Sequence, residues 1–193
     1  MNPAEIREVL ERRGAILTGH FLLSSGRHSD VYVQKFRVFE DPRLTQRFGE
    51  AIAAGFPDAF DVVAAPAVGA IVLGFATALA VDARFVIAER VEGAMVFRRG
   101  FAIRPHERVL VVEDVLTTGA SVQEVIDLVG DGPGKLAGVG ALIDRMDPTR
   151  AGGFNAPFKA LLKLDVASWE ADECPLCDRN EALVDPGSRR LSS

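Results

Sequence analysis

The stretch VLVVEDVLTTGAS, residues 109–121, decides the fold of this chain. It begins with four apolar residues, Val109 to Val112, and a valine-rich run of this kind is typical of a buried strand in a parallel sheet. Two acidic residues and a hydroxyl-rich loop follow the run. Ser121 precedes Glu124 by three residues, which is the spacing of a capping box and predicts a helix that begins at Ser121. The stretch therefore predicts a strand, a loop and a helix in succession.

The loop has the composition of an anion-binding site. Thr117, Thr118 and Ser121 supply hydroxyl groups. The first backbone amides of the following helix can donate hydrogen bonds to an anion. Glu113 and Asp114 stand at the end of the strand, where carboxylates can accept hydrogen bonds from sugar hydroxyls. The spacing of a Walker phosphate loop and the G-x-G-x-x-G dinucleotide fingerprint are both absent from the sequence. A phosphorylated sugar is the ligand that this combination indicates.

Length and composition limit the class of protein. A chain of 193 residues with 48% hydrophobic residues is long enough to bury the core of one domain. The net charge of -5 argues against nonspecific nucleic-acid binding, which needs a basic face. A membrane helix needs about 18 or more consecutive apolar residues, and the sequence has no such run. The charged N-terminus lacks the apolar segment of a signal peptide, so we expect a cytoplasmic protein without membrane or nucleic-acid partners.

The rest of the chain alternates between strand-like and helix-like segments. Asn2-Pro3 and Asp41-Pro42 each place a proline after a capping residue, so helices are expected to begin there and to end near Gly14 and Gly55. A buried helix is expected over about residues 70–79. Apolar runs of strand length occur at residues 61–65, 84–88, 109–112, 136–143 and 158–166.

Two hairpins are expected beside this alternation. The first pairs residues 21–23 with residues 29–36 across a turn at residues 24–26. The second pairs residues 95–97 with residues 101–103 across the basic pair Arg98-Arg99, after a charged loop at residues 89–93. Both are inferred from turn residues between apolar runs.

The order of these segments predicts an α/β fold, namely a doubly wound, mostly parallel sheet flanked by helices. Ligands bind beyond the carboxyl ends of the strands in such sheets. We therefore expect one cleft formed by the loops at residues 65–69, 89–93, 113–121 and 144–145. Residues 1–185 are expected to form a single domain, and residues 186–193 a disordered tail.

Several motifs resemble a known family. EDVLTTGAS, residues 113–121, resembles the phosphoribosyl diphosphate (PRPP) signature of the type I phosphoribosyltransferases. The segments GHFLLSSGRHSDVYVQ (residues 19–34) and APAVGAIVLG (residues 65–74), together with Asp144-Arg145, resemble orotate phosphoribosyltransferase, as does ECPLC near the C-terminus. The resemblance covers roughly residues 5 to 185, with the motifs in the same order.

The resemblance implies a fold, a reaction and a site. The fold would be the type I phosphoribosyltransferase fold with a small N-terminal hood, mainly residues 15–38, and the protein would be a homodimer. The reaction would transfer the 5-phosphoribosyl group from PRPP to orotate in UMP biosynthesis, with Mg²⁺ held through PRPP rather than by protein ligands. PRPP would be bound by Arg90 and by the signature residues Glu113, Asp114, Val115, Leu116, Thr117, Thr118, Gly119, Ala120 and Ser121. Orotate would be bound by Thr117, Arg145, Ser25 and Gly26.

The catalytic groups implied by the resemblance are Glu113, Asp114 and Arg90. Many orotate enzymes carry a long loop with an arginine–lysine pair, a further lysine and a histidine, whereas this chain has the compact AERVEGAMVFRRG at residues 88–100. Arg90 is the best match to the basic pair, and Arg98 or Arg99 are possible substitutes. Two other functions remain open, namely phosphoribosyl transfer to a purine or uracil, and non-catalytic sensing of PRPP.

Cys174 and Cys177 have the spacing of half a zinc site. We expect the chain to offer no second pair of ligands, so a reduced turn is expected here, with a zinc site shared across a dimer or a redox pair as alternatives. His28 is expected to lie in the hood, with contact to a ligand as an alternative to a structural role, and His20 is expected to have a structural role.

Overall fold

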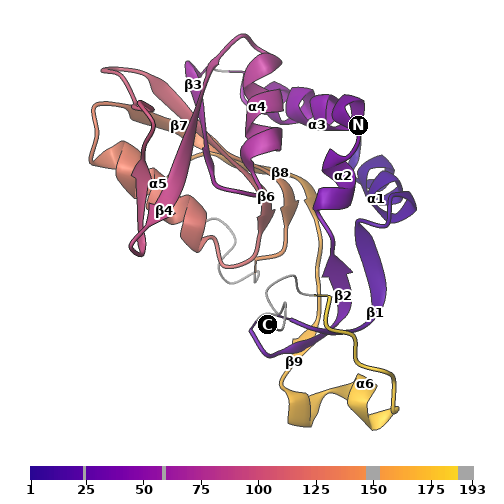
Figure 1. Ribbon diagram of the computed structural model, residues 1–193. Helices are drawn as coiled ribbons and strands as arrows, with labels where there is room; N and C mark the ends of the chain where they lie inside the picture. The colour runs from indigo at the N-terminus through magenta and orange to yellow at the C-terminus, as the bar shows by residue number, and fades with distance from the viewer. Residues whose placement is uncertain (24, 58–59, 147–152, 187–193) are drawn as a thin grey trace.

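The computed structural model describes residues 1–23, 25–57, 60–146 and 153–186. A six-stranded sheet forms its centre, with the strand order β5-β4-β3-β6-β7-β8 (Figure 1). All neighbouring strands are parallel except β5, which is antiparallel to β4 at the sheet edge. The strands are β3 (Val62–Pro66), β4 (Arg84–Val91), β5 (Ala94–Phe97), β6 (Arg108–Leu116), β7 (Lys135–Asp144) and β8 (Phe158–Lys163). The predicted doubly wound, mostly parallel sheet is confirmed.

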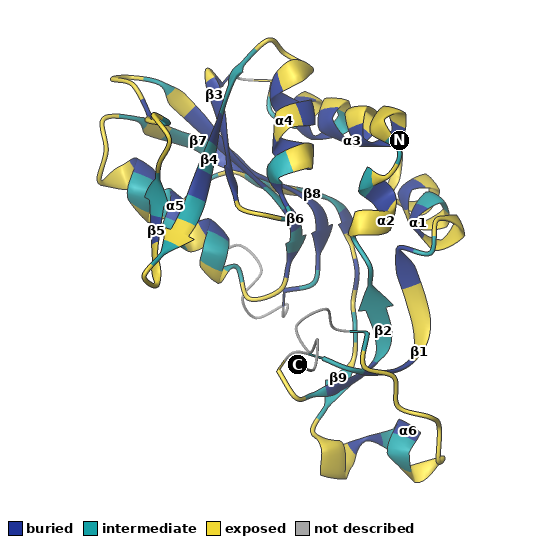
Figure 2. Ribbon diagram, in the orientation of Figure 1, coloured by how far each residue is buried: buried dark blue, intermediate teal, exposed yellow. Residues whose placement is uncertain are grey.

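Helices cover both faces of this sheet, as Figure 1 shows. Along β6, Leu110 and Val112 pack in the same cluster as α3 (Pro42–Ala54) and α4 (Ile71–Leu79), whereas Val109 and Val111 pack with α5 (Ala120–Gly130). Successive side chains of a strand point to opposite faces, so an unbroken apolar run is needed where both faces are buried. Figure 2 accordingly shows the middle of the sheet as buried.

Side chains cap two of the three helices whose starts were predicted from a capping residue, namely α1 (Pro3–Arg12) and α3 but not α5. In α1, Asn2 and Glu5 form a reciprocal capping box, and in α3 the Asp41 carboxylate accepts hydrogen bonds from two backbone amides. The capping box predicted at Ser121 is wrong. The helix begins at Ala120 after Gly119, which has a left-handed backbone (φ 76°) and makes no side-chain cap.

The second predicted hairpin is also wrong in its pairing. Residues 88–91 of β4 pair with residues 94–97 of β5, so the turn lies at Glu92-Gly93 and residues 89–91 are strand rather than loop. Residues 101–103 are not in a strand. Both Glu92-Gly93 and Arg99-Gly100 have positive φ angles, so the two dipeptides carry the same turn chemistry. The pairing with the extended β4 decides between them.

A second, three-stranded sheet lies beside the central one. The predicted first hairpin is present as β1 (Ile16–Leu22) and β2 (His28–Val33), which are antiparallel, and β9 (Ser168–Trp169) pairs with β2 from the other end of the chain. The one-turn helix α2 (Phe36–Phe39) connects β2 to α3. The 3-10 turn η2 (Ala171–Glu173) and α6 (Pro175–Asp178) follow β9. We call β1, β2 and β9 the hood sheet.

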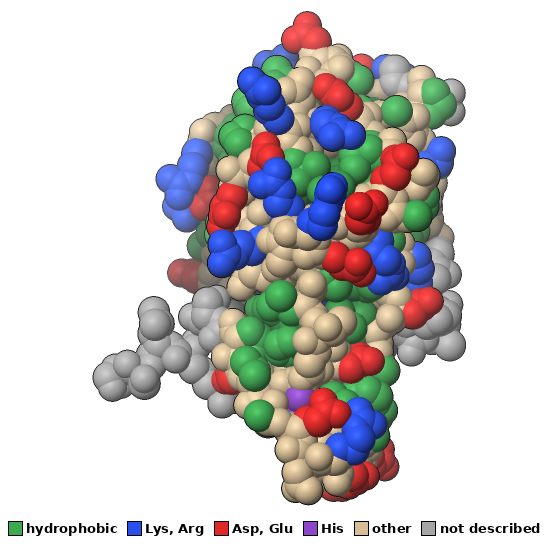
Figure 3. Space-filling view, turned by 90° about the vertical axis from the view of Figure 1, so that its right-hand side faces the viewer, with side chains coloured by type: hydrophobic (Ala, Val, Ile, Leu, Met, Phe, Trp, Pro, Cys, Tyr) green, Lys and Arg blue, Asp and Glu red, His purple; other side chains and the backbone are tan. Residues whose placement is uncertain are grey.

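Two of the sequence predictions fall outside the described residues, at Ser24 of the first turn and at residues 187–193 of the expected tail. Of the helices that the structure describes, none combines the length and the apolar character needed to cross a membrane. On the face that carries α1 and β1, acidic and basic side chains are interspersed (Figure 3).

Candidate active site

The cleft lies where the chain reverses direction across the sheet. From β3 the chain passes through α4 to β4 on one side, whereas β6 lies on the other side of β3 and continues through α5 to β7. The loops after β3 and β6 therefore diverge and leave a crevice at the carboxyl ends of these two strands. A cavity of about 680 Å³ opens there. Its wall is formed by residues of four segments, namely Pro66–Gly69, Glu113 with Ser121, Tyr32–Phe36 of the hood side, and Pro186.

Two of the four loops expected at the cleft line this cavity. These are the loop after β3 and the loop after β6. The segments at residues 89–93 and 144–145 are not among its lining residues. The missing side of the cleft is supplied by the segment that follows β2, which connects the hood sheet to α2.

Glu113 and Asp114 lie near the C-terminal end of β6. The strand extends to Leu116, beyond its predicted end. Asp114 is buried, and its Oδ1 accepts a hydrogen bond from the Val115 amide at 2.6 Å. Glu113 lines the cavity, and its Oε1 accepts a hydrogen bond from the Asp114 amide at 2.9 Å. Burial and the neighbouring Asp114 carboxylate raise the pKa of Glu113 well above its usual range. The pair thus combines the Glu113 carboxyl group, whose raised pKa favours the protonated form, with the Asp114 carboxyl group, which is paired with a cation.

That cation is Lys35, which sequence reasoning missed. Its Nζ lies 2.8 Å from Oδ2 of Asp114, and the lysine also lines the cavity. The family-like stretch at residues 19–34 ends one residue before Lys35. The position of Lys35 near the end of the second strand of the predicted hairpin could have indicated its role, because that end of the strand faces the cleft.

Gly69 allows the loop after β3 to approach this ion pair. A Cβ atom at Gly69 would overlap both Oδ2 of Asp114 and Nζ of Lys35. The backbone of this loop contains a cis peptide between Ala67 and Val68. The backbone φ of Gly69 is not in the left-handed region, so conformation does not require a glycine there. The close approach of Asp114 and Lys35 does.

The predicted anion loop forms a separate small pocket of about 50 Å³. Its lining comprises Glu113, Val115, Leu116, Thr117, Thr118, Gly119, Ala120, Ser121 and Val122. The pocket lies at the N-terminus of α5, where backbone amides without intrahelical partners favour an anion. The left-handed Gly119 turns the chain into the helix, and a Cβ there would press on the Phe154 ring at 3.2 Å. Except for Asp114, all the predicted signature residues meet at this pocket, and Glu113 and Ser121 join it to the larger cavity.

Arg145 follows Asp144 at the end of β7, beside the signature loop. Its backbone amide donates a hydrogen bond to the Leu116 carbonyl at 2.8 Å. The side chain is half-buried, and burial lowers the pKa of its guanidinium. The Nε of Arg145 is buried and has no hydrogen-bond partner within the described part of the chain. A half-buried guanidinium with a free donor can bind an anionic or carbonyl-bearing ligand.

The remaining predicted residues lie elsewhere. Arg90 forms an ion pair with Glu124 of α5 at 2.7 Å and donates a hydrogen bond to the Gly93 carbonyl, and Arg99 pairs with Glu89 at 2.6 Å. Ser25 and Gly26 occupy the turn between β1 and β2. None of these residues is among those that line the two cavities. The structure thus brings together the acid pair and the anion loop, but not Arg90 or the hood turn.

Comparison with known proteins gives close relatives over the whole length. Orotate phosphoribosyltransferase of Thermoanaerobacter sp. (strain X514) is 46% identical over 192 residues, which cover 99% of this chain and 100% of the relative. The enzyme of Thermotoga maritima is 44% identical over 191 residues, 96% of this chain and 99% of the relative. No protein-family model matches the chain.

Solved structures show the same architecture. Orotate phosphoribosyltransferase of Aeropyrum pernix has a TM-score of 0.71 at 23% identity and covers 82% of this chain and 93% of its own. The Mycobacterium tuberculosis H37Rv enzyme in complex with PRPP has a TM-score of 0.64 at 25% identity, with 84% and 96% covered. The fold is that of the type I phosphoribosyltransferases. Given its identity with full-length relatives, the chain belongs to the orotate phosphoribosyltransferase family.

Proposed function

We propose that this protein transfers the 5-phosphoribosyl group from PRPP to orotate and releases orotidine 5′-monophosphate and diphosphate. The observation that carries the proposal is that the two cavities are adjacent and share the lining residues Glu113 and Ser121. Glu113 at the end of β6 lines both the larger cavity and the anion pocket at the N-terminus of α5, so a sugar and its terminal phosphate can bind side by side. Membership of the family supplies the identity of the base.

The reaction needs no covalent nucleophile from the protein. The orotate ring nitrogen attacks C1 of the ribose while the bond from C1 to the diphosphate oxygen breaks. The leaving diphosphate keeps the electron pair, and the proton of the attacking nitrogen passes to the diphosphate or to solvent. The amides and hydroxyls of the 50 Å³ pocket bind the 5-phosphate, and the acid pair faces the ribose. Positioning and electrostatic stabilisation are then the main sources of rate.

The acidic groups of the site fit a magnesium–PRPP complex. Mg²⁺ prefers oxygen ligands and phosphates, and Glu113 lines the cavity with its carboxyl group. Bound through PRPP, the ion would neutralise charge on the leaving diphosphate. Lys35 forms an ion pair with Asp114 beside the loop after β3, and a diphosphate in that loop would have Lys35 as its nearest cation.

Arg145 and Thr117 are proposed to contact the base, and Arg90 is proposed to reach the diphosphate only if it leaves Glu124. Ser25 and Gly26 are proposed to approach the base by movement of the hood turn. The proposed organisation is a single domain over residues 1–185, in the cytoplasm.

A homodimer is proposed on the basis of an exposed apolar stripe. Val72, Phe75 and Leu79 of α4 lie three to four residues apart and are 46%, 55% and 61% exposed. Val68, just before the helix, is 72% exposed. Side chains at this spacing share one helix face, and an exposed apolar face of this kind is typical of subunit contacts.

The test is loss of orotate absorbance on addition of PRPP and Mg²⁺, with uracil, hypoxanthine and adenine as competing bases. The proposal predicts turnover with orotate alone among the four. Turnover with another base in preference to orotate would identify a different transferase, and PRPP binding without turnover of any base would indicate a sensor.

A further inference from the structure

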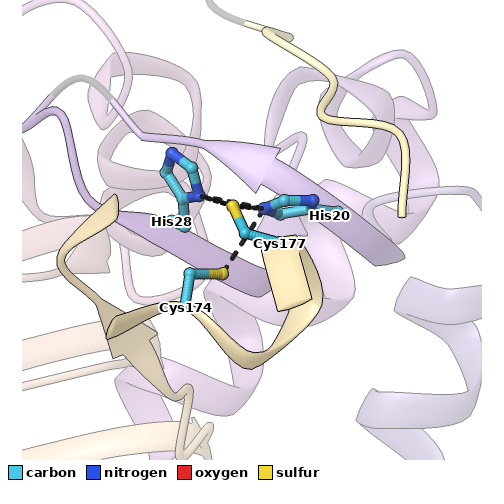
Figure 4. A group of neighbouring side chains, drawn as sticks. All are labelled: His20, His28, Cys174 and Cys177. Carbon is cyan, nitrogen blue, oxygen red and sulfur yellow. Dashed lines mark hydrogen bonds between the residues drawn. The ribbon is translucent and has the colours of Figure 1, made fainter. Parts of the chain in front are cut away.

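A compact group of metal-binding side chains lies in the hood, away from the acid pair. It is formed by His20 of β1, His28 of β2, and Cys174 and Cys177 beside α6 (Figure 4). We call these four residues the Cys2His2 cluster. The expectation that the chain has no second pair of zinc ligands is therefore wrong. The two histidines complete the set, and they are about 150 residues from the cysteines in sequence.

The four ligand atoms converge on one point. All of them lie within 4.8 Å of one another. The Sγ of Cys177 is 3.3 Å from Nδ1 of His28 and 3.8 Å from Nε2 of His20. The Sγ of Cys174 is 3.5 Å from Nε2 of His20, and the two histidine nitrogens are 2.9 Å apart. A zinc tetrahedron with bonds of about 2.0–2.3 Å has edges of about 3.3–3.8 Å. The three sulfur–nitrogen separations match these edges, and the two nitrogens, which lie closer together, would need to move apart by a few tenths of an ångström around one ion.

The surroundings prepare the histidines for a metal. Nδ1 of His20 lies 2.9 Å from the Glu181 carbonyl, which can only accept, so Nδ1 carries the proton and Nε2 presents its lone pair to the cluster. His20, His28 and Cys174 are at most 6% exposed. The backbone after Cys174 turns back on itself, because the Cys177 amide donates a hydrogen bond to the Cys174 carbonyl at 3.0 Å. This turn places both thiols on the same side.

We propose that the Cys2His2 cluster binds one structural Zn²⁺. Two thiolates and two imidazoles in a closed, buried arrangement are typical of structural zinc, whereas a catalytic zinc keeps an open position. A two-iron cluster would need its histidine pair and its cysteine pair held by different metal atoms. Four ligand atoms that all lie within 4.8 Å of one another favour a single ion instead.

The zinc ion fastens the C-terminal segment to the hood and thereby holds one wall of the cavity. Beyond Cys177, the Val184 amide donates to the His20 carbonyl at 2.8 Å, and the Leu22 amide donates to the Val184 carbonyl at 2.9 Å. Two residues further on, Pro186 lines the 680 Å³ cavity. Loss of the metal is therefore expected to loosen residues 174–186 without removing any ligand of PRPP.

The first test is metal analysis of the full-length protein, purified under reducing conditions without chelators. We expect about one zinc per chain, and strong depletion of zinc in Cys177→Ser and in His20→Ala. His106→Ala is the matched control, because His106 is exposed, lies in a turn before β6 and is the one histidine outside the cluster. It is expected to keep the wild-type zinc content.

A second test keeps the proposal falsifiable if the variants fold poorly. Wild-type protein stripped of metal is titrated with Co²⁺, and the proposal predicts the intense visible bands of tetrahedral cobalt with a near-ultraviolet sulfur-to-metal band that saturates at one equivalent. Zinc-free wild-type protein that also gives no tetrahedral cobalt spectrum would overturn the proposal. So would zinc that persists in Cys177→Ser and His20→Ala, or a Cys174–Cys177 disulfide found by mass spectrometry in metal-free protein. None of these readouts depends on transfer to orotate.

Discussion

Asp114 is 1% exposed, and Lys35 is its ion-pair partner at 2.8 Å. Replacing Asp114 by Asn keeps the shape of the side chain but removes the charge that pairs with Lys35 beside the proposed ribose site. We expect kcat to fall by about 10²-fold or more, the size of effect seen when one electrostatic contact to a transition state is lost. Steady-state kinetics, with circular dichroism to verify the fold, provide the measurement. Turnover within twofold of wild type would remove Asp114 from the reaction.

Glu113 gives the unliganded protein a pH dependence of known sign. Burial and the Asp114 carboxylate raise its pKa in the folded protein, so the folded state binds more protons than the unfolded state above the ordinary value of 4.5. Stability conferred by the protonated group is complete below that value and falls as pH rises through the folded pKa. Glu113→Gln cannot ionise, so its free energy of unfolding relative to wild type should increase with pH and then level off.

Urea unfolding of both proteins at a series of pH values from 4.5 upwards measures this difference. The measurement is made without PRPP or Mg²⁺, because a bound cation would favour the ionised form of Glu113. A difference that stays constant, or that decreases with pH, would contradict the assignment.

Arg145 is half-buried with a free Nε, beside the signature loop. Arg145→Ala is expected to raise KM for orotate by about 10-fold or more, because hydrogen bonds to a charged group are worth about 1.5–3 kcal/mol. KM for PRPP should change much less. Equal losses for the two substrates, measured by varying each at saturation of the other, would place Arg145 outside the base pocket.

At the scale of elements, the loop after β3 depends on the absence of one side chain. A methyl group at Gly69 would overlap the Lys35–Asp114 ion pair, so Gly69→Ala should displace one of these side chains and reduce kcat by about 10-fold or more. Gly130→Ala is the matched control, because a Cβ at Gly130 at the end of α5 meets nothing within 4 Å. It should leave kcat unchanged. Wild-type kinetics in Gly69→Ala would show that the loop can move away at no cost.

Local patterns predicted the elements whose partners are close in sequence. The apolar run at Val109 to Val112 indicated a strand buried on both faces, and Asp41-Pro42 indicated the start of α3, because each signal lies within the element itself. The start of α5 was missed by one residue because Gly119 begins the helix by its backbone conformation, while Glu124 pairs with Arg90. The sequence also indicated the loop between β6 and α5 for the same reason that it indicated β6, since the residues of the loop are contiguous.

Contacts between distant segments were beyond the sequence patterns. Lys35 meets Asp114 across 79 positions, and β9 joins β2 across about 140. Nothing in the local composition near residue 168 indicates a strand of two residues that depends on β2 for its hydrogen bonds. The cysteine pair has the spacing of half a zinc site, but a reduced turn was expected, because strand pairing and not spacing brings the two histidines to the cysteines.

For the whole molecule, the exposed apolar stripe of α4 is the proposed dimer interface, so charges placed on it should prevent dimerisation. The combined substitution Val72→Glu and Leu79→Glu places two charges on that face and should convert a dimer into monomers, as measured by sedimentation velocity. Leu17→Glu, an exposed apolar position on β1, is the control and should leave the assembly unchanged. A dimer that persists in the double variant would exclude α4 from the interface.

The hood sheet contains strands from both ends of the chain, and this bears on how the protein is synthesised. β1 and β2 are synthesised well before β9, so an edge of β2 and two histidines stay exposed until residues 168–184 have been made. The central sheet from β3 to β8 is complete before that point, so the nascent protein can build its phosphate pocket while the wall at Pro186 is still missing. A chain that stops before residue 168 would therefore keep the strands of the central sheet but lack β9, both cysteines of the cluster and the wall of the cavity at Pro186.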